Sequence, residues 1–493
     1  MKRPTLAELA PQYDIIVIGG GITGAGILHE AARSGAKCLL LEQNDFASGT
    51  SSGSSKLVHG GLRYLRSGQW RMTQDSVRER ERLLNEAPDL VEKQPFMIPV
   101  YRGEKPGKLA VRLGLWIYDY MAGGSNSLWV GADEAMRLES DIRSEGLLGA
   151  MLYDDARTND ARLVVTLITQ ACTSGATARS YTRVESLLRA GDRVRGVAIR
   201  DADGATREVE AGLVVDATGV SAGSLGQDGA APKLRPLRGS HFVFAHKRLP
   251  VLRAVSWLHP RDRRPVFAYP WENVTLVGTT DLDHDPADAP WRMNAAESDY
   301  LVEGLLHQFP KLELKAADAL CSFSAVRPVV AGGKGAASDE SRESALWSEP
   351  GLVGVTGGKL TTFRLTAKRV LQEAGRQLPN FSPADRTVTM FSKVSTVMRT
   401  QTRNVEEVSL AGSKYSLAKV RWAARHEQVV HLDDVMLRRT RLGIVTPAGG
   451  RAMLAGVAGV LRQELLWNDE RWREEERRYL AIWDAQHAPT AVR

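Results

Sequence analysis

Apolar and polar positions follow two different patterns in the first 42 residues. The run from Tyr13 to Ile18 is apolar and rich in β-branched residues, which is typical of a parallel strand that is buried on both faces. Residues 22–34 have the pattern of a helix, and KCLLLE at 37–42 is a second apolar run. This order predicts a strand, a helix and a second strand of one parallel sheet.

Three glycines, Gly19, Gly21 and Gly24, separate the first predicted strand from the helix, and Glu42 follows the last of them by eighteen residues. The first glycine permits a tight turn, the second lets the backbone reach a pyrophosphate, and the third lets helix and strand approach closely. The helix N-terminus offers N–H groups to phosphates, and Glu42 is placed to accept hydrogen bonds from an adenosine ribose. A glycine-rich turn that only packs a helix against a strand would not explain Glu42 at the end of the second strand. The sequence therefore predicts a dinucleotide-binding fold.

Later segments favour FAD over NAD. The loop FASGTSSGSSKLVHGG at 46–61 is rich in hydroxyls and can run along an extended cofactor. An apolar strand ends in DATG at 216–219, and residues 351–371 run from a strand through two glycines into a helix. Strand-to-turn elements this far apart are typical of FAD domains. The candidate cofactor contacts outside the first glycine turn are Thr50, Ser51, Ser52, Ser54, Ser55, Ala217, Thr218, Gly219, Gly358, Lys359, Leu360 and Thr361.

The spacing of these elements predicts an α/β fold in which a discontinuous, Rossmann-like FAD-binding domain carries an inserted antiparallel-sheet substrate domain and a C-terminal all-α domain. The β-rich run RPVFAYPWENVTLVGTTDLD at 264–283 indicates a hairpin in the inserted sheet. The predicted boundaries are 1–74, 151–235 and 326–380 for the FAD-binding domain, 75–150 for an insert facing substrate or membrane, 236–325 for the substrate domain and 385–493 for the helical domain.

Residues 416–443 and 456–483 have the pattern of amphipathic helices, which is the basis for the separate C-terminal domain. His426 and His431 lie five positions apart, so a helix does not align them as metal ligands, and no acidic or thiol partner is fixed nearby. We therefore expect no metal site.

Composition narrows the class of partner. The chain has 493 residues and a formal net charge of +7, which favours phosphorylated metabolites or an anionic membrane surface. Basic residues are dispersed among acidic ones without a nucleic-acid-binding motif, so we expect no nucleic-acid partner. Three widely spaced cysteines indicate reduced thiols, and neither a signal peptide nor a membrane-spanning run occurs. We expect a cytoplasmic protein.

Seven motifs follow one another along the chain: IVIGGGITGAGI (16–27), TSSGSSKLVHGGLRYL (50–65), NDARL (159–163), RGSHFVF (238–244), VGTTDLD (277–283), SAVRP (324–328) and GGKLTTFR (357–364). Together they resemble the FAD-dependent glycerol-3-phosphate dehydrogenases, membrane-associated enzymes that make dihydroxyacetone phosphate. The similarity covers essentially the whole chain, and Phe363 is a departure, because much of the family has tyrosine there.

The resemblance implies that a phosphate-bearing substrate lies among Arg63, Tyr64, His59, His241, Arg327 and Lys359. Oxidation of a secondary alcohol by flavin needs a base for the hydroxyl proton and a firm grip on the substrate. Arginine suits a phosphate or a developing alkoxide, and histidine titrates near the working pH. Arg327 and Lys359 are expected to orient the hydroxyl and the phosphate. Either His59 or His241 is the base, with His59 placed first.

Quinone is the family's common electron acceptor, which makes a membrane quinone the expected partner. Residues 105–124 combine apolar and aromatic side chains with Lys105, Lys108 and Arg112, a composition that suits a helix lying on an anionic lipid surface. A helix packed on the protein's own core is an equally good interpretation of the residues alone. We expect peripheral association with the inner face of the cell membrane, and a homodimer is a further arrangement that the sequence leaves open.

Other functions remain open at this stage. An oxygen-using glycerol-3-phosphate oxidase would share the same substrate pocket. Another flavin oxidoreductase would replace the phosphate with the carboxylate of a hydroxy or amino acid. A flavin-binding sensor without turnover would have no evident need for a second cationic pocket.

Overall fold

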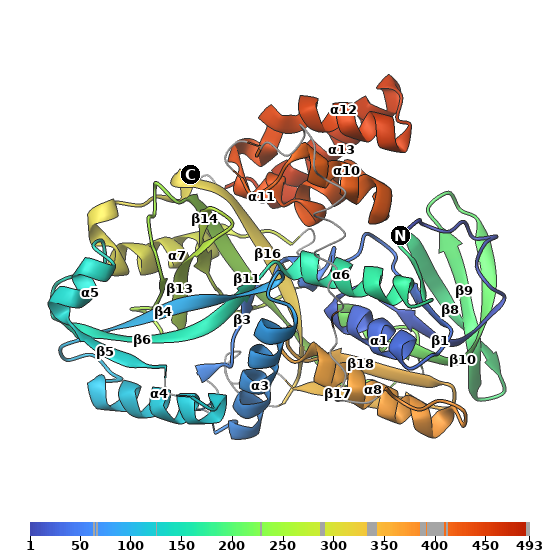
Figure 1. Cartoon of the computed structure of the whole chain (residues 1–493), viewed down its shortest axis with the longest axis horizontal. Coiled ribbons are helices and arrows are strands. Elements are labelled where there is room, and N and C mark those ends of the chain that lie inside the picture. Colours follow the sequence, from blue (N-terminus) through green and yellow to red (C-terminus); the bar gives the residue numbers. More distant parts are fainter. Residues whose placement is uncertain are drawn as a thin grey trace.

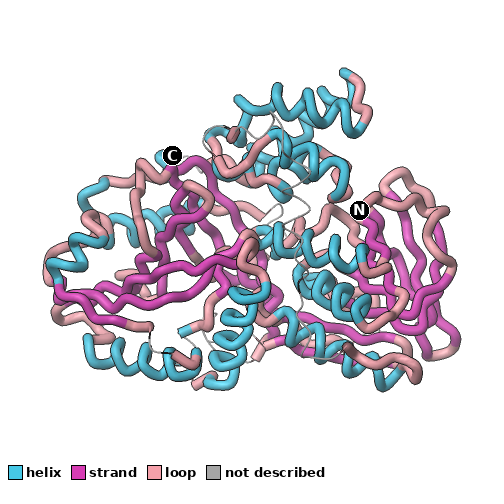
Figure 2. The backbone as a smooth tube through the Cα atoms, in the orientation of Figure 1, coloured by secondary structure: helices cyan, strands magenta, loops and turns pink. Residues whose placement is uncertain are grey.

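The computed structural model describes residues 1–62, 65, 68–124, 126–226, 229–285, 291–332, 343–384, 391, 409–410 and 413–489. Two sheets lie side by side, and a helical unit from the C-terminal part of the chain covers them at one end (Figures 1 and 2). Arg63 and Tyr64, two of the predicted substrate contacts, lie outside the described residues.

The first sheet is built on the strand that the apolar run predicted, β1 (Gln12–Ile18), whose last four residues are buried. Its strand order is β17-β18-β10-β1-β2-β7, and the neighbours from β18 to β7 are parallel. The antiparallel pair β8–β9 extends β10. The other strands are β2 (Cys38–Leu41), β7 (Thr177–Arg179), β8 (Thr182–Ala190), β9 (Arg193–Asp201), β10 (Thr206–Asp216), β17 (Ser344–Glu349) and β18 (Leu352–Gly357).

Helices α1 (Ile22–Arg33), α6 (Asp160–Thr173) and α8 (Phe363–Gln377) pack together beside this sheet (Figure 1). Gly26 of α1 allows α8 to approach, because a Cβ there would lie 2.7 Å from the Phe363 ring. Phe363 is buried and serves packing at the position where the family often has tyrosine. The register places Asp216 beside both Ile18 and Gly354, so the carboxyl ends of β1, β10 and β18 meet. Ligands bind at such an edge of a parallel sheet.

The second sheet has ten strands in the described residues, with the path β15-β11-β14-β13-β12-β4-β6-β3. The predicted hairpin is confirmed, since Tyr269 of β13 pairs antiparallel with Leu276 of β14. The strands are β3 (Leu57–Val58), β4 (Val91–Tyr101), β5 (Leu128–Gly131), β6 (Leu147–Thr158), β11 (Leu234–Ala245), β12 (Ala254–Leu258), β13 (Pro265–Trp271), β14 (Val274–Gly278), β15 (Leu282–Asp283) and β16 (Ala319–Val330).

Four α-helices of the described residues accompany the second sheet: α3 (Trp70–Glu86), α4 (Lys108–Ala122), α5 (Ala132–Leu138) and α7 (Ala295–Gln308). The domain division drawn from the sequence stays a proposal. Three of its boundaries, after residues 150, 235 and 325, fall inside β6, β11 and β16, which all belong to this second sheet, and a fourth, after residue 74, falls inside α3.

The C-terminal unit is helical, as predicted, but its helices are shorter than the amphipathic pattern suggested. Residues 416–443 do not form one helix: α10 (Leu417–His426) ends before Gln428, whose φ of 49° no helix accommodates. A π-helical turn (Asp434–Arg439) and α11 (Leu442–Val445) follow. Residues 456–483 are likewise divided into α12 (Leu454–Leu465) and α13 (Asp469–Gln486) by Leu466, which has a φ of 56°.

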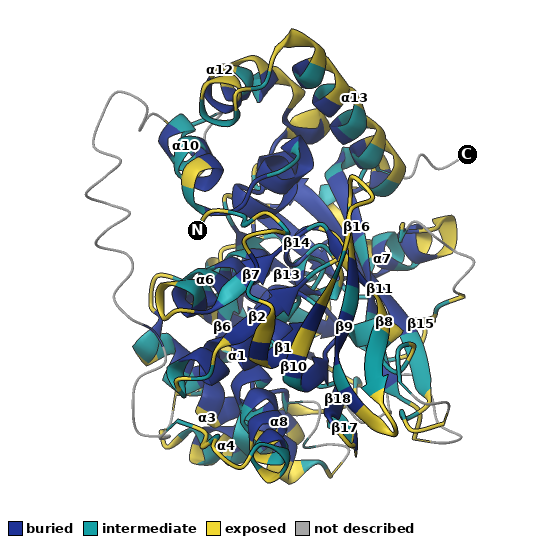
Figure 3. Ribbon diagram, turned by 90° about the vertical axis from the view of Figure 1, so that its right-hand side faces the viewer, coloured by how far each residue is buried: buried dark blue, intermediate teal, exposed yellow. Residues whose placement is uncertain are grey.

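The central strands are buried, whereas α12 and α13 expose their outer faces (Figure 3). Among the described helices, none combines the length and apolar character that crossing a bilayer demands. The described residues also contain no group of three or more histidine, cysteine, aspartate or glutamate side chains able to hold a metal ion.

Candidate active site

A cavity of about 1130 Å³ is lined by residues from both sheets. It collects most of the site residues that the sequence predicted. The predicted residues in its wall are Gly19, Gly21, Glu42, Thr50, Ser51, Ser54, Ser55, His59, Ala217, Thr218, Gly219, Arg327, Gly358, Lys359, Leu360 and Thr361. Gly24, Ser52 and His241 do not line it, and of these Gly24 and His241 are buried.

The glycine turn after β1 is shaped by backbone contacts that exclude side chains. Gly19 has a φ of 110°, and a Cβ there would lie 2.5 Å from the carbonyl oxygen of Ala217. A Cβ on Gly24 would lie only 1.9 Å from the carbonyl oxygen of Gly19. The first and third glycines therefore bring β1, β10 and α1 together, and the second, Gly21, faces the cavity.

Glu42, at the end of β2, is fixed by backbone donors. Its Oε2 accepts a hydrogen bond from the Gly20 N–H at 2.7 Å, and its Oε1 accepts one from the Asn44 N–H at 2.8 Å. Ser51 reaches the start of α1, where its Oγ accepts a hydrogen bond from the Ile22 N–H at 2.9 Å. A close backbone turn, a helix N-terminus and an anchored carboxylate in one wall fit a dinucleotide such as FAD.

Two of the predicted cations line the same cavity, and they come from elements far apart in the sequence. Arg327 extends from β16, donating from Nη1 to Asp281 Oδ1 at 3.0 Å and from Nη2 to Thr279 Oγ1 at 3.0 Å. Its guanidinium covers Gly239, where a Cβ would lie 2.1 Å from Nη2. Lys359 lies between β18 and α8 and donates from Nζ to Ser76 Oγ at 2.7 Å. The neighbours of both cations fix their positions in the cavity wall. An anionic ligand in the cavity can therefore accept charge-assisted hydrogen bonds from them.

The two histidines differ in their access to the cavity. His59 lines it, and its carbonyl oxygen accepts a hydrogen bond from Thr361 Oγ1 at 3.4 Å. His241 is buried, with its Nε2 2.8 Å from Ser55 Oγ and its ring stacked on Phe323 at a centroid distance of 4.8 Å. Burial, assisted by the charge of Arg327, lowers the pKa of His241 well below its usual value. Within the described residues, His241 Nδ1 has no hydrogen-bond partner.

Three charged residues, Lys56, Asp160 and Arg441, form a buried cluster at the hydroxyl-rich loop of residues 46–61. The sequence did not predict this cluster. Lys56 Nζ is 3.1 Å from Asp160 Oδ2, and Arg441 Nη2 donates to Asp160 Oδ1. Burial lowers the pKa of Lys56 to about 8. Burial alone would raise the pKa of Asp160, but the charges of Lys56 and Arg441 keep it below its usual value. The first two residues lie in motifs quoted above, yet nothing local in the sequence signals that they pair.

A second missed cluster supports the backbone next to His59. Arg80 Nη1 donates to Asp155 Oδ1 at 2.7 Å, and Tyr118 of α4 donates to Asp155 Oδ2 at 3.0 Å. The Gly60 N–H donates to the Tyr118 oxygen at 2.9 Å. Asp155 itself lines the cavity, so this cluster connects α4 with the chain segment that carries His59.

Comparison with known proteins agrees with this geometry. The sequence model of the family described as FAD dependent oxidoreductase matches residues 14–372, and that of the C-terminal domain of alpha-glycerophosphate oxidase matches residues 389–472. The glycerol-3-phosphate dehydrogenase of Mycobacterium leprae is 32% identical, with 96% of this chain and 88% of that protein covered. The chain belongs to the FAD-dependent glycerol-3-phosphate dehydrogenase family. The family resemblance drawn from the sequence is thereby confirmed, as is FAD as the cofactor.

Other proteins are similar to this chain in sequence or in fold. The aerobic glycerol-3-phosphate dehydrogenase of Staphylococcus epidermidis is 34% identical, over 74% of this chain and 68% of its own length. The crystal structure of the glycerol-3-phosphate dehydrogenase of Bacillus halodurans complexed with FAD superposes with a TM-score of 0.76 at 25% identity, covering 96% of this chain and 94% of that one. Glycine oxidase from Geobacillus kaustophilus shares the fold, with a TM-score of 0.57 at 20% identity over 77% of this chain and 100% of its own.

Proposed function

We propose that this enzyme oxidises sn-glycerol 3-phosphate to dihydroxyacetone phosphate. One observation carries the proposal: Arg327, Lys359 and His59 line the same cavity as the glycine turn and Glu42. A substrate with a phosphate and a secondary alcohol needs cations for the first and a base for the second. The names of the relatives agree with this substrate.

When bound, FAD supplies the acceptor at flavin N5 for a hydride from C2 of the substrate. We assign the glycine turn and Ser51 to its pyrophosphate, and Glu42 to its ribose, because these groups lie at the carboxyl edge of the first sheet. The remaining predicted serine, threonine and glycine contacts, apart from Ser52, which does not line the cavity, follow the cofactor towards its reactive end.

Arg327 and Lys359 orient the substrate in this proposal. The guanidinium of Arg327 is already fixed by Asp281 and Thr279, so little side-chain freedom is lost on binding. A planar arginine gives directional hydrogen bonds to an oxyanion, whereas lysine acts as a point charge. Arg63 and Tyr64 remain expected substrate contacts from the family resemblance.

His59 is the proposed base, because it alone of the two candidate histidines lines the cavity. It removes the hydroxyl proton of the substrate with its imidazole. His241 is the second candidate, acting on the substrate through Ser55, whose Oγ is within hydrogen-bond distance of its Nε2. The lowered pKa of His241 keeps its imidazole neutral, and only a neutral imidazole can accept a proton through Ser55.

We further propose that α4 lies on an anionic membrane surface and that the electrons pass to a membrane quinone. One face of α4 exposes large apolar side chains at helical spacing, and Lys108 and Arg112 accompany them. The exposed side chains are Leu109 (80%), Leu113 (59%), Trp116 (62%) and Tyr120 (79%). The other face buries Leu115 and Tyr118. Leu113, Gly114 and Ile117 also line the cavity, so a lipid-borne acceptor would approach the site from this helix.

The substrate is tested by initial rates with a quinone analogue as acceptor. We expect turnover with sn-glycerol 3-phosphate and none with glycerol, lactate or glycine at equal concentration. Turnover with lactate or glycine, and none with the phosphate ester, would contradict the proposal. Hydrogen peroxide formed in step with substrate loss, without quinone, would identify the oxygen-using oxidase instead.

The membrane surface is tested with anionic liposomes. We expect glutamate at Lys105, Lys108 and Arg112 to reduce cosedimentation, since each basic residue contributes roughly 1 kcal/mol near an anionic surface. A matched variant with glutamate at Arg195, Arg200 and Arg207, on strands β9 and β10 of the first sheet, is expected to sediment like the wild type. Equal binding by all three proteins would remove α4 from the proposal.

A further inference from the structure

Three arginines in one short segment of the C-terminal unit, Arg438, Arg439 and Arg441, bond to their own unit and also contact the cofactor-binding part of the chain. All three are buried, with at most 7% of the residue exposed. Their acidic partners include Asp45 and Asp160, which are more than 270 residues away in sequence. Buried arginines that pair with carboxylates so far away in the sequence form a specific contact between the two parts.

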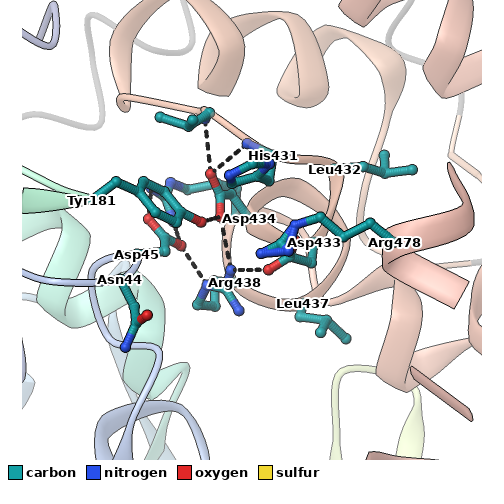
Figure 4. Close-up of polar contacts among 12 residues, drawn as sticks. Asn44, Asp45, Tyr181, His431, Leu432, Asp433, Asp434, Leu437, Arg438 and Arg478 are labelled. Atoms are coloured by element: carbon teal, nitrogen blue, oxygen red, sulfur yellow. Dashed lines mark hydrogen bonds and ion pairs between the residues drawn. The ribbon is translucent and has the colours of Figure 1, made fainter. Parts of the chain in front are cut away.

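Asp45 forms the first contact. Arg439 holds it with two hydrogen bonds of 2.7 Å, from Nη1 to Oδ2 and from Nη2 to Oδ1, and Arg438 donates from Nε to Oδ2. Figure 4 shows Arg438 between Asp45 and the pair Asp433 and Asp434. The opposing charges raise the pKa of Arg438 well above its usual value despite its burial.

Asp160 forms the second contact. Arg441 donates from Nη2 to Asp160 Oδ1 and from Nη1 to the carbonyl oxygen of Ser52 at 3.3 Å. Asp160 in turn accepts from Lys56 Nζ at 3.1 Å and from Ser54 Oγ at 2.7 Å. Lys56 Nζ also donates to the Ser52 carbonyl oxygen at 2.8 Å, so this end of the loop is held by several bonds at once.

Asp45 and Lys56 are the two ends of one loop, residues 45–56, which we name the cofactor loop. Its middle lines the cavity through Thr50 and Ser51 and reaches α1 through the hydrogen bond from the Ile22 N–H. We propose that Arg438, Arg439 and Arg441 of the C-terminal unit position the cofactor loop for FAD by fixing both of its ends. This inference rests on the placement of FAD in the cavity given under the proposed function.

A coupling of this kind must be reciprocal. If docking of the arginine segment favours the loop conformation that binds FAD, then FAD must favour docking of the segment by the same factor. FAD affinity and the order of residues 434–445 are therefore predicted to change together, although the two regions belong to different parts of the sequence.

The first test replaces single arginines and measures FAD binding to the apoprotein by flavin fluorescence. We expect Arg439→Met and Arg441→Met to raise the Kd for FAD by at least about tenfold, because each leaves a buried carboxylate with fewer partners. Arg439→Lys and Arg441→Lys keep the charge and should recover part of the affinity. Arg441→Met should also lower kcat more than it raises KM, because it releases the loop end next to Ser54 and Ser55.

Arg451→Met is the matched control, since Arg451 belongs to the same unit but pairs with Asp484 on its exposed surface. It should bind FAD as the wild type does. Wild-type FAD affinity in folded Arg439→Met and Arg441→Met proteins would overturn the inference. The FAD-binding assay uses no substrate, so its outcome, unlike that of the kcat and KM comparison, is independent of whether sn-glycerol 3-phosphate is oxidised.

If the methionine variants do not fold, hydrogen exchange on the wild-type chain tests the coupling between FAD binding and the arginine segment. Backbone amides of residues 434–445 should exchange at least about tenfold more slowly in the FAD-bound protein than in the apoprotein, while strand β9, which pairs with β8 and β10 of the first sheet, serves as the internal reference. Equal exchange of residues 434–445 in the two forms would contradict the proposal.

Discussion

The two ends of the cavity are built in different ways. The end assigned to the nucleotide is made mainly from backbone, within residues 19–42, and its shape depends on the absence of side chains at Gly19 and Gly24. The end assigned to the substrate is made from side chains of distant segments, His59, Arg327 and Lys359. The first end therefore depends on steric fit and the second on charge, and each should fail under a different kind of substitution.

The largest effect is expected from Gly24→Ala at the nucleotide end. Its Cβ would lie 1.9 Å from the Gly19 carbonyl oxygen, so α1 cannot keep its present distance from β1. We expect loss of bound FAD and hence of all activity, measured as the flavin-to-protein absorbance ratio after purification. Gly459→Ala is the control: nothing lies within 4 Å of that Cβ, and alanine should stabilise α12 by about 0.5–1 kcal/mol. Full FAD retention by Gly24→Ala would refute the steric account.

The next effect tests charge at the substrate end. Arg327→Met removes the planar cation while keeping a side chain of similar length, and we expect kcat/KM for sn-glycerol 3-phosphate to fall by about 10³-fold. FAD content should stay normal. Arg235→Met, which removes a cation that pairs with Asp283 outside the cavity, should keep wild-type kinetics. If kcat/KM of Arg327→Met decreases by less than about threefold, this arginine does not bind the substrate.

A third experiment separates the two histidines at the substrate end. His59→Gln should lower kcat by about 10²–10⁴-fold, the usual contribution of a general base. His241→Gln should lower it less, because His241 lies behind Ser55 and not in the cavity wall. The pH profile of kcat/KM distinguishes them further, since only loss of the true base removes the acidic limb. A larger loss in His241→Gln would reverse the assignment.

The smallest effect concerns stability beside the nucleotide end. His29 of α1 is buried against Gln170 of α6, and burial lowers its pKa to about 4. Between pH 6.5 and 4 the unfolded chain binds this proton and the folded chain does not, so stability falls as the pH falls. This residue alone should remove about 3 kcal/mol between pH 7 and 4. Urea unfolding of His29→Gln should show a weaker pH dependence than the wild type; an unchanged slope would contradict this.

The contrast between the two ends also explains which features could be predicted from the sequence. The glycine turn, Glu42 and the strands around them form a contiguous pattern, and local geometry dictates their arrangement. His59, Arg327 and Lys359 were found through family motifs, and the sheets then bring them together. The position of His241 behind Ser55 was not predictable, because it depends on the antiparallel register that places His241 beside Gly278 and Phe323.

Ion pairs between residues far apart in the sequence could not be predicted either. Lys56, Asp160 and Arg441 are each ordinary charged residues in sequence, and they form a cluster only because three separate elements meet. The breaks within the C-terminal helices were missed for a similar reason. The amphipathic pattern continues across Gln428 and Leu466, but both residues have a positive φ, and the side chain of Gln428 donates hydrogen bonds to the distant carbonyl oxygens of Lys2 and Ala178.

The central claim is that one cavity holds both FAD and a phosphorylated secondary alcohol. It is tested most directly by mixing the FAD-loaded protein with sn-glycerol 3-phosphate without oxygen while following the flavin absorbance at about 450 nm. We predict that the band bleaches with this compound and persists with glycerol, lactate and glycine. A band that persists with sn-glycerol 3-phosphate, in protein that retains its FAD, would contradict the account.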